Sequence, residues 1–316
     1  MERNLVLRSL HHSFLGIIVL TSLFLFVSFF YGCNPNPIKK GPVYTVDSIV
    51  STVPVYCFAV HPLHNPTMLF QSYQPLIDHL NSRLVGAKLR LEASRDYTSF
   101  EEKFKQRKLE FILPNPWQTT EAMEKGYHVI AMAGDASNFR GIILVRKDSK
   151  IVEPKDLIGK TISYPSPTAL AACIMPQYFL FKQGIDINKD IINKYVGSQE
   201  SSIFNVYFKT ADAGATWPPP WKAFQKSHPN EASALKVIWE TESLVSNSVM
   251  VRNDVPDDIA EQVQKYLIEL EHSDEGKKIL SGMETARFSL ATNADYKIAK
   301  DFTDRFETEV RIININ

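Results

Sequence analysis

Two segments of the chain place a polar residue and a proline at the predicted start of a helix. Asn115-Pro116-Trp117 follows the apolar run 109–113, and Ser166-Pro167-Thr168 follows the run 160–164. Proline suits the first turn of a helix, because the N–H group that it lacks would have no partner there. The free N–H groups of that turn and the helix dipole attract anions. The two segments therefore predict an oxyanion site, and the alternative is that Asn115 and Ser166 only cap their helices.

Further polar residues follow the carboxyl ends of predicted strands, where open α/β sheets bind their ligands. Gly197-Ser198-Gln199 opens a third helix, and the loop 61–65 follows the first strand and holds His61 and His64. For His61 we expect a role in the turn first and a ligand contact second. The candidate ligand-binding residues are His61, Asn115, Trp117, Ser166, Thr168, Ala169, Ser198, Gln199, Asp212 and Trp217.

Two tryptophans stand beside these segments. Trp117 is predicted at the mouth of a cleft, where its indole could cover a ligand, and the alternative is packing at the surface of a lobe. The run Trp217-Pro-Pro-Pro-Trp221 is either a rigid lip of the cleft or a stiff loop. Trp217 is the better ligand candidate because it directly follows Thr216. An indole could also face a cationic part of the ligand, and Asp212 could pair with an amine.

The elements that must position these residues alternate along the chain. Apolar residues recur at helical spacing over 69–84. The predicted strands are 53–60, 88–93, 109–113, 128–133, 140–146, 160–164, 194–197, 211–215, 235–239 and 247–252. The predicted helices are 69–84, a short one around Phe100 and Phe104, 116–125, 168–182, 199–208, 259–270 and 294–310.

This alternation predicts an α/β protein with parallel-rich sheets. The strand 140–146 resembles the strand 247–252 about a hundred residues later. A second α/β unit between two similar strands predicts two lobes joined by two crossovers, which can close around a ligand. We expect residues 52–139 and 247–316 in the first lobe, residues 140–246 in the second, and the last helix packed on the first lobe.

The N-terminus predicts export from the cytoplasm. Arg3 and Arg8 precede the apolar stretch 14–30, which is typical of a secretory signal peptide. The alternative is a transmembrane anchor, because the stretch is as long as the shortest spans of ~17–25 residues. Gly32-Cys33 resembles the end of a bacterial lipobox, which predicts a signal peptide over 1–33 and lipidation of Cys33. Residues 34–51 would then form a solvated tether to the membrane.

Composition and motifs exclude several functions. The chain has 35 basic and 35 acidic residues, so nothing in its charge favours nucleic acid. It contains no Gly-x-Ser-x-Gly, His-Glu-x-x-His or P-loop motif, and its eight histidines do not cluster at metal-ligand spacing. We therefore expect no cofactor, no metal and no enzyme activity. Cys57 and Cys173 are either buried thiols or a disulfide.

Five ordered segments carry a resemblance to a known family. They are Tyr73-Gln-Pro-Leu-Ile-Asp-His-Leu80, Leu109-Glu-Phe-Ile-Leu-Pro-Asn-Pro-Trp117, Val145-Arg-Lys-Asp-Ser149 with Asp156-Leu-Ile-Gly-Lys160, Gly197-Ser-Gln-Glu200 and Ala211-Asp-Ala-Gly214. From about Val53 to Phe306 the chain resembles the phosphate/phosphonate-binding family of ABC-transporter solute receptors. The resemblance implies a two-lobed fold of the periplasmic-binding-protein type II, with an anionic solute held in the cleft between the lobes.

The chain departs from the family pattern at the expected anion site. Ser166-Pro167-Thr168-Ala169 stands where the family usually has a Ser-Thr-Ser run, and Gln199 replaces a frequent histidine. Proline removes one N–H donor, and Ala169 removes one hydroxyl. Each charge-assisted hydrogen bond is worth ~1.5–3 kcal/mol, so the losses weaken the binding of a tetrahedral dianion most.

The resemblance implies an extracytoplasmic lipoprotein of the bacterial cell envelope. It would present a phosphonate-, phosphite- or phosphate-like solute to an ABC permease and its ATPase. An alternative is a receptor subunit that reports its ligand to a membrane sensor kinase. Some cytoplasmic enzymes share the two-lobed fold, but an export signal disfavours that reading.

Overall fold

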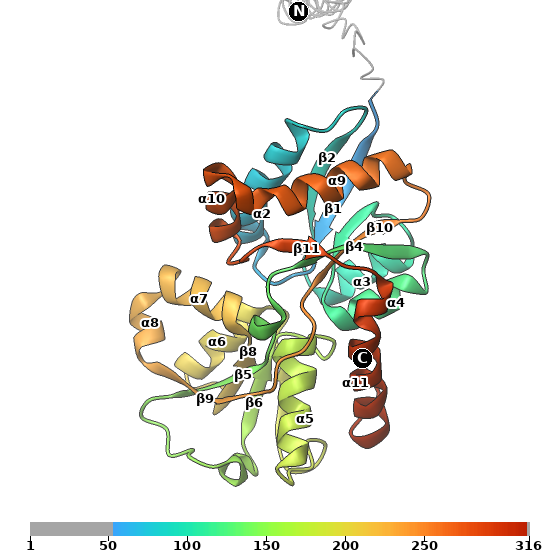
Figure 1. Cartoon of the computed structure of the whole chain (residues 1–316). Coiled ribbons are helices and arrows are strands. Elements are labelled where there is room, and N and C mark those ends of the chain that lie inside the picture. The colour runs from blue at the N-terminus through green and yellow to red at the C-terminus, as the bar shows by residue number, and fades with distance from the viewer. Residues whose placement is uncertain (1–52, 315–316) are drawn as a thin grey trace, which may run out of the picture. The chain divides into compact units, whose positions relative to one another are not determined.

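The computed structural model describes residues 53–314, which contain two mixed β-sheets with helices packed on their faces (Figure 1). The strand order is β11-β4-β10-β3-β1-β2 in the first sheet and β7-β6-β8-β5-β9 in the second. We call each sheet with its helices a lobe. Parallel pairs join β1 to β2 and β3, and join β6 to β7 and β8, whereas β4, β5, β9, β10 and β11 pair antiparallel. The predicted α/β class is confirmed, and the sheets are mixed.

The first lobe is built from two stretches of the chain. Its strands are β1 (Val55–Val60), β2 (Lys88–Ala93), β3 (Phe111–Leu113), β4 (Tyr127–Ala133), β10 (Ser248–Arg252) and β11 (Phe288–Leu290). Its helices are α2 (Pro66–Asn81), α3 (Tyr97–Lys105), α4 (Pro116–Met123), α9 (Asp257–Glu269) and α10 (Asp274–Gly282).

The second lobe lies between these stretches in sequence. Its strands are β5 (Ile142–Arg146), β6 (Thr161–Tyr164), β7 (Ile192–Tyr195), β8 (Ala213–Thr216) and β9 (Leu235–Glu240). Its helices are α5 (Met175–Lys182), α6 (Gln199–Tyr207), α7 (Pro218–Ser227) and α8 (Pro229–Ser233). The chain therefore crosses between the sheets after β4 and again after β9.

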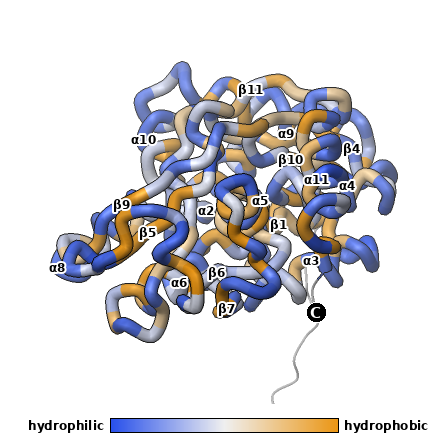
Figure 2. The backbone as a smooth tube through the Cα atoms, turned by 90° about the horizontal axis from the view of Figure 1, so that it is seen from below, coloured by the Kyte–Doolittle hydropathy of each residue, from blue (hydrophilic) through white to orange (hydrophobic). Residues whose placement is uncertain are grey.

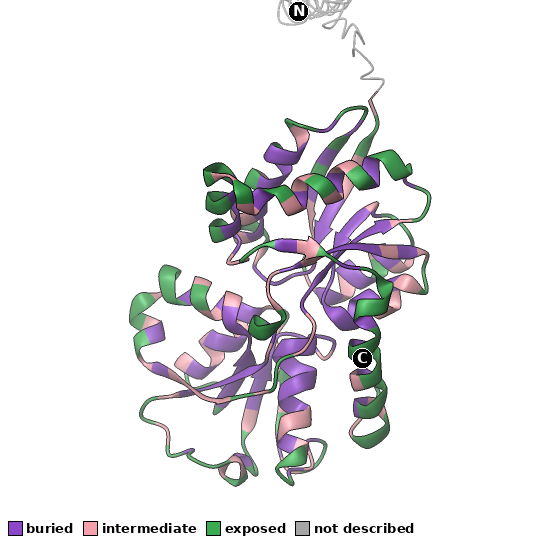
Figure 3. Ribbon diagram, viewed as in Figure 1, coloured by how far each residue is buried: buried purple, intermediate pink, exposed green. Residues whose placement is uncertain are grey.

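The core of each lobe lies along its strands, and the outer faces of the helices are exposed (Figure 3). Hydrophobic residues gather along strands such as β5, while the segment around α8 at the edge is largely hydrophilic (Figure 2). Strands β3, β5 and β10 are buried over almost their whole length. Burial of both faces explains why these strands are continuous apolar runs rather than alternating ones.

The last helix, α11 (Lys297–Glu309), contacts both lobes. It packs on α4 of the first lobe, and its Phe302 and Phe306 rings lie 5.3 and 6.4 Å from the Tyr178 ring on α5. The sequence predicts packing on the first lobe. The apolar face of α11 also covers an aromatic side chain of the second lobe.

Two segments near the predicted site fold differently from expectation. The three prolines 218–220 form the first turn of α7, where no N–H group is needed, so the run after Trp217 is helix rather than a lip or loop. The helix after Ser166 begins only at Leu170, with a π-helical segment (Leu170–Ile174) before α5. Pro176 cannot donate to the preceding turn, which explains the widened spacing at this point.

Both described cysteines, Cys57 and Cys173, are free thiols. Burial raises the pKa of Cys57 to about 11 and that of Cys173 to about 12. Within residues 53–314, no helix has the length and apolar character needed to span a membrane. The predicted signal peptide, Cys33 and the tether lie outside the described residues.

Candidate ligand-binding site

Asn115 joins the two lobes at the start of α4. Its Oδ1 accepts the Gln118 backbone N–H at 3.0 Å, and the Gln118 side chain accepts the Asn115 N–H at 3.1 Å. This capping box confirms the predicted helix start. The Asn115 side-chain amide also donates to the Thr168 carbonyl of the second lobe at 3.1 Å. Asn115 therefore caps its helix and contacts the second predicted anion segment.

Glu101 of α3 lies against that same segment. The Thr168 hydroxyl donates to Glu101 Oε1 at 2.7 Å, and the Gln118 side-chain amide donates to the same oxygen at 2.9 Å. The other carboxylate oxygen, Oε2, is buried and has no hydrogen-bond partner among the described residues. Glu101 is 0% exposed, and this burial raises its pKa to about 7. The Thr168 hydroxyl, which the sequence predicts as a hydrogen-bond donor to an oxyanion, thus donates to a carboxylate of the first lobe instead.

Glu101 is absent from the residues predicted from the sequence, although one signal pointed to it. Tyr97, Phe100 and Phe104 are buried at helical spacing on α3, and position 101 falls on the same face. A carboxylate on an apolar face of a helix indicates a buried ionisable group, which is a functional-site signal.

Gln199 forms a second contact between the lobes. Its amide donates to the Tyr97 hydroxyl at 3.0 Å, and its carbonyl accepts the Thr216 hydroxyl at 2.8 Å. The His61 ring is 6.1 Å from the Tyr97 ring, and His61 Nδ1 donates to the Leu113 carbonyl at 2.9 Å. Burial lowers the pKa of His61 to about 4, so its ring is neutral at pH 7. The structure therefore brings His61 and Gln199 together around Tyr97.

The remaining polar candidates occupy different positions. Ser166 Oγ lies 2.9 Å from Thr168 Oγ1, and Ala169 is buried directly after it. Ser198 caps α6 by accepting the Ser201 N–H at 3.1 Å, and α6 begins at Gln199, where the sequence predicts a helix. Asp212 is exposed and accepts the Thr161 N–H at 2.9 Å.

Asp212 differs from its predicted place because it precedes β8. Thr161 starts β6, which runs parallel to β8, so the two residues mark the amino ends of these strands. The candidate site lies at the opposite, carboxyl ends. The structure therefore gives no basis for pairing Asp212 with an amine of the ligand.

Trp117 also lies apart from the predicted cleft. Its ring is buried, and the Lys105 ammonium lies 5.9 Å from the ring centroid. Trp117 lines a groove between α4 and α11, together with Glu121 and Lys300. The structure places this indole in packing between helices, which was the alternative interpretation.

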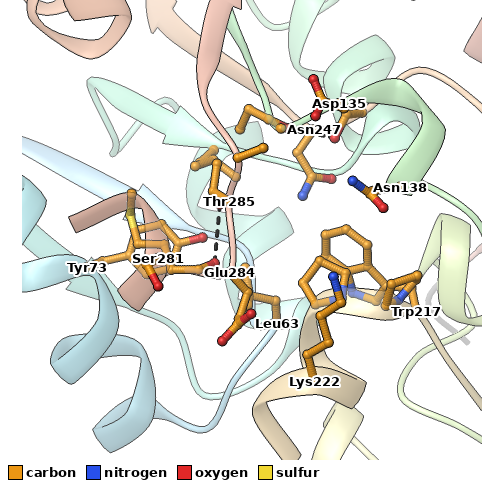
Figure 4. Close-up of a pocket in the computed structure, with 18 residues that line it drawn as sticks. Leu63, Tyr73, Asp135, Asn138, Trp217, Lys222, Asn247, Ser281, Glu284 and Thr285 are labelled. Carbon is orange, nitrogen blue, oxygen red and sulfur yellow. Dashed lines mark hydrogen bonds between the residues drawn. The ribbon is translucent and has the colours of Figure 1, made fainter. Parts of the chain in front are cut away.

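Trp217 lies instead on the wall of a cavity between the lobes, with a volume of about 230 Å³ (Figure 4). Its ring centroid is 5.4 Å from that of Phe139. The lining comes from the first sheet, the start of α7, both crossovers, and the end of α10 with the segment after it. The residues labelled in Figure 4 are Leu63, Tyr73, Asp135, Asn138, Trp217, Lys222, Asn247, Ser281, Glu284 and Thr285.

The polar lining of this cavity combines amides with a lysine. Figure 4 shows Lys222 beside the indole of Trp217, with the amides of Asn138 and Asn247 across from it. Asn247 Oδ1 is buried without a hydrogen-bond partner in the described part of the chain. The two carboxylates on the wall are already paired with cations, Asp135 with Arg287 at 2.9 Å and Glu284 with Lys226. The positive charge of Lys222 therefore makes the cavity wall more favourable for an anion.

The cavity lies next to the polar residues at the helix starts, because residues of its wall are hydrogen-bonded to them or directly follow them in the chain. Trp217 follows Thr216, which holds Gln199, and Leu113 of the wall accepts the hydrogen bond of His61. No sequence motif predicts the cavity, because its lining comes from segments far apart in the chain. Only Trp217 of its wall is among the residues predicted from the sequence.

Comparison with known proteins identifies the family. The sequence profile described as "ABC transporter, phosphonate, periplasmic substrate-binding protein" matches residues 58–296. The chain belongs to this family. Among the residues that the structure describes, no group of three or more His, Cys, Asp or Glu side chains is placed to hold a metal ion.

Known phosphonate-transporter binding proteins share the fold of the chain. The binding protein component of an ABC phosphonate transporter from Pseudomonas aeruginosa superposes with a TM-score of 0.75 at 18% identity, covering 81% of this chain and 87% of that one. PhnD1 from Prochlorococcus marinus in complex with methylphosphonate gives a TM-score of 0.73 at 20% identity, covering 82% and 99%. These likenesses confirm the predicted two-lobed periplasmic-binding-protein fold.

One curated relative also matches in sequence. A probable ABC transporter phosphite binding protein, PhnD1 of Prochlorococcus marinus, is 25% identical over 182 residues. The match spans 54% of this chain and 61% of that relative. The chain thus spans less than two thirds of the length of this relative.

Proposed function

We propose that this substrate-binding protein captures a small phosphorus oxyanion, of the phosphonate or phosphite class, between its two lobes and delivers it to an ABC permease and ATPase. The observation that carries the proposal is the meeting of hydrogen-bonding side chains from both lobes at the carboxyl ends of their strands. Asn115 and Tyr97 come from the first lobe, and Thr168 and Gln199 from the second. A relative described as phosphite-binding, and a neighbour solved with methylphosphonate, support this ligand class.

In this proposal the oxyanion binds beside Ser166 and Thr168, and its substituent points into the cavity beside Trp217. Hydroxyl and backbone N–H groups suit an anion at that point, because they donate hydrogen bonds without bringing a full charge. Lys222 adds long-range attraction for an anion entering the cavity. The volume of about 230 Å³ restricts the substituent to a small group.

The protein is further proposed to be held at the outer face of a bacterial membrane by a lipid on Cys33. The Gly32-Cys33 pair and the apolar stretch before it support this anchor. Labelling with radioactive palmitate would detect it in the wild-type protein, and a Cys33→Ser variant that is labelled equally would exclude it.

A thermal-shift panel on residues 34–316 tests the ligand class. The compounds are methylphosphonate, 2-aminoethylphosphonate, phosphite, phosphate, sulfate and acetate. A ligand present at 100 times its Kd stabilises the fold by ~2.7 kcal/mol, so we expect one phosphorus oxyanion to raise the Tm by several degrees. The absence of a shift with every phosphorus compound would contradict the proposal.

Variants of two tryptophans in the same segment test whether the ligand binds in the cavity. Trp217→Leu removes the indole from the cavity wall and is expected to weaken the active ligand about tenfold, which is ~1.4 kcal/mol. Trp221→Leu is the matched control, because Trp221 stacks on Phe224 of α7 and does not line the cavity. Equal Kd values for the two variants, measured by calorimetry, would place the ligand elsewhere.

A further inference from the structure

The contact between Glu101 and Thr168 is a hydrogen bond across the lobes that competes with the proposed ligand. A threonine hydroxyl has one hydrogen to donate, and here it points to Glu101 Oε1 at 2.7 Å. The same hydroxyl is the donor that the sequence assigns to an oxyanion. While the carboxylate accepts this hydrogen, Thr168 cannot donate to a second anion.

The second carboxylate oxygen of Glu101, Oε2, is free to interact with a ligand. Oε2 is buried without a partner among the described residues, and the whole residue is 0% exposed. An unpaired carboxylate oxygen at such a site is costly when it is charged. Once protonated, the carboxyl group has an O–H that can donate to a neighbouring oxyanion.

We propose that Glu101 determines the specificity of the binding site, by admitting an oxyanion only together with a proton. In the complex one proton lies between Glu101 and the ligand, either on the carboxyl group or on a ligand oxygen. The proton comes from solvent or arrives with the ligand, and no other bond forms or breaks. Phosphonates and phosphite can share this proton near neutral pH, whereas with sulfate it must stay on the carboxyl group, so the site would favour phosphonates and phosphite. This inference rests on the proposed function of the same site.

The surroundings of Glu101 support a proton at this position. The charged groups acting on it are Lys105, one turn further along α3, and Glu121 of α4, and these two lie 3.7 Å apart as a pair. From the second lobe Glu101 receives only the Thr168 hydroxyl, and the nearby Arg311 donates to the Pro167 carbonyl at 2.9 Å. Burial is thus the largest influence and raises the pKa of Glu101 to about 7.

Calorimetry of methylphosphonate binding between pH 5.5 and pH 8 tests the proposal with the wild type and Glu101→Gln. Glutamine keeps the acceptor for Thr168 and places a permanent N–H donor near the position of Oε2. Because about nine tenths of a group with a pKa near 7 is ionised at pH 8, we expect the ratio of wild-type to variant Kd to rise about tenfold from pH 6 to pH 8. In two buffers of different ionisation enthalpy, the wild type is expected to take up close to one proton more than the variant at pH 8.

Glu102→Gln is the matched control, because Glu102 is the exposed neighbour of Glu101 on α3. It removes the same charge and is expected to keep the wild-type pH profile. Sulfate binding to the wild type needs no variant, since the charge of sulfate is constant over this range. Uptake of nearly one proton with sulfate at pH 8, and of almost none at pH 5.5, would support the role of Glu101.

The outcomes separate this inference from the proposed function. Binding of methylphosphonate with a constant Kd ratio and equal proton uptake in both proteins would overturn the role of Glu101 and leave the proposed function intact. Failure of every phosphorus oxyanion to bind the wild type and both variants would overturn the proposed function, and the role of Glu101 with it.

Discussion

Replacing Glu101 with glutamine is expected to raise the stability of the unliganded protein relative to wild type by about 3 kcal/mol more at pH 8 than at pH 4.5. Burial raises the pKa of Glu101 from 4.5 to about 7 in the folded state. The folded protein therefore binds this proton more tightly than the unfolded chain does. Its stabilising effect is complete below pH 4.5 and is lost as the pH rises towards 7, by ~1.4 kcal/mol for each unit of pKa shift.

Two buried histidines change the stability with pH in the opposite direction to Glu101, so their effect must be distinguished from that of Glu101. Burial lowers the pKa of both His61 and His64 from 6.5 to about 4. Their contribution is present above pH 6.5 and is lost as the pH falls towards 4, because the unfolded chain then binds the protons. Wild type and Glu101→Gln share this acidic loss, so it cancels in the difference between them.

Urea unfolding at pH 4.5, 6, 7 and 8 measures this difference. A fixed offset from burying the glutamine amide does not affect the change with pH. Glu102→Gln is expected to differ from wild type by at most a few tenths of a kcal/mol, because surface charges contribute little. A difference between Glu101→Gln and wild type that stays constant over the four pH values would show that Glu101 does not carry the raised pKa.

The helix starts of the site could be predicted from sequence because their signals are local. Asn115 with Gln118, and Ser198 with Ser201, form capping bonds within one turn, and the structure has both helices where the motifs place them. The predicted helix start after Ser166 was wrong, because residues 166–169 form a turn closed by the Ala169 N–H and the Ser166 carbonyl at 3.2 Å, and the helical segment begins only at Leu170. A polar residue followed by proline also suits the first two positions of a turn, so the motif does not by itself distinguish a turn from a helix start.

The parts of the site that depend on contacts between distant segments could not be predicted. The Thr168 hydroxyl meets a carboxylate 67 residues earlier in the chain, and the wall around Trp217 joins loops from both lobes. Trp117 and Trp217 look alike in sequence, since each precedes a proline or follows one at a helix start. Only packing separates them, with one against α11 and the other in the cavity.

Helix α10 and strand β11 were not predicted from the sequence, and for α10 the reason lies in its first turn. Ser273 caps α10 by accepting the Gly276 N–H at 3.0 Å, but a glycine inside the first turn weakens the helix signal. The glycine is required by packing, because a Cβ atom there would lie 1.9 Å from the Leu270 carbonyl oxygen. The close contact with Leu270 therefore requires glycine at position 276, although glycine has a low helix propensity.

That contact makes Gly276→Ala a strong test of the fold around the cavity. The added Cβ atom would also lie 2.6 and 2.8 Å from the carbonyl carbon and Cα of Leu270, which begins the 3-10 turn Leu270–His272. Backbone atoms cannot rotate away as a flexible side chain can, so α10 must shift. Such overpacking costs ~1–3 kcal/mol and occasionally more, and we expect a loss of about 3 kcal/mol in urea unfolding.

Gly282→Ala, at the other end of α10, is the matched control. Nothing lies within 4 Å of a Cβ atom at Gly282, so alanine is expected to raise stability by up to ~1 kcal/mol through helix propensity. Because Ser281 and residues 283–286 line the cavity, a shift of α10 is also expected to weaken ligand binding in Gly276→Ala. If the two alanine variants are equally stable, the close approach of α10 to Leu270 is wrong, and so is the cavity wall that follows from it.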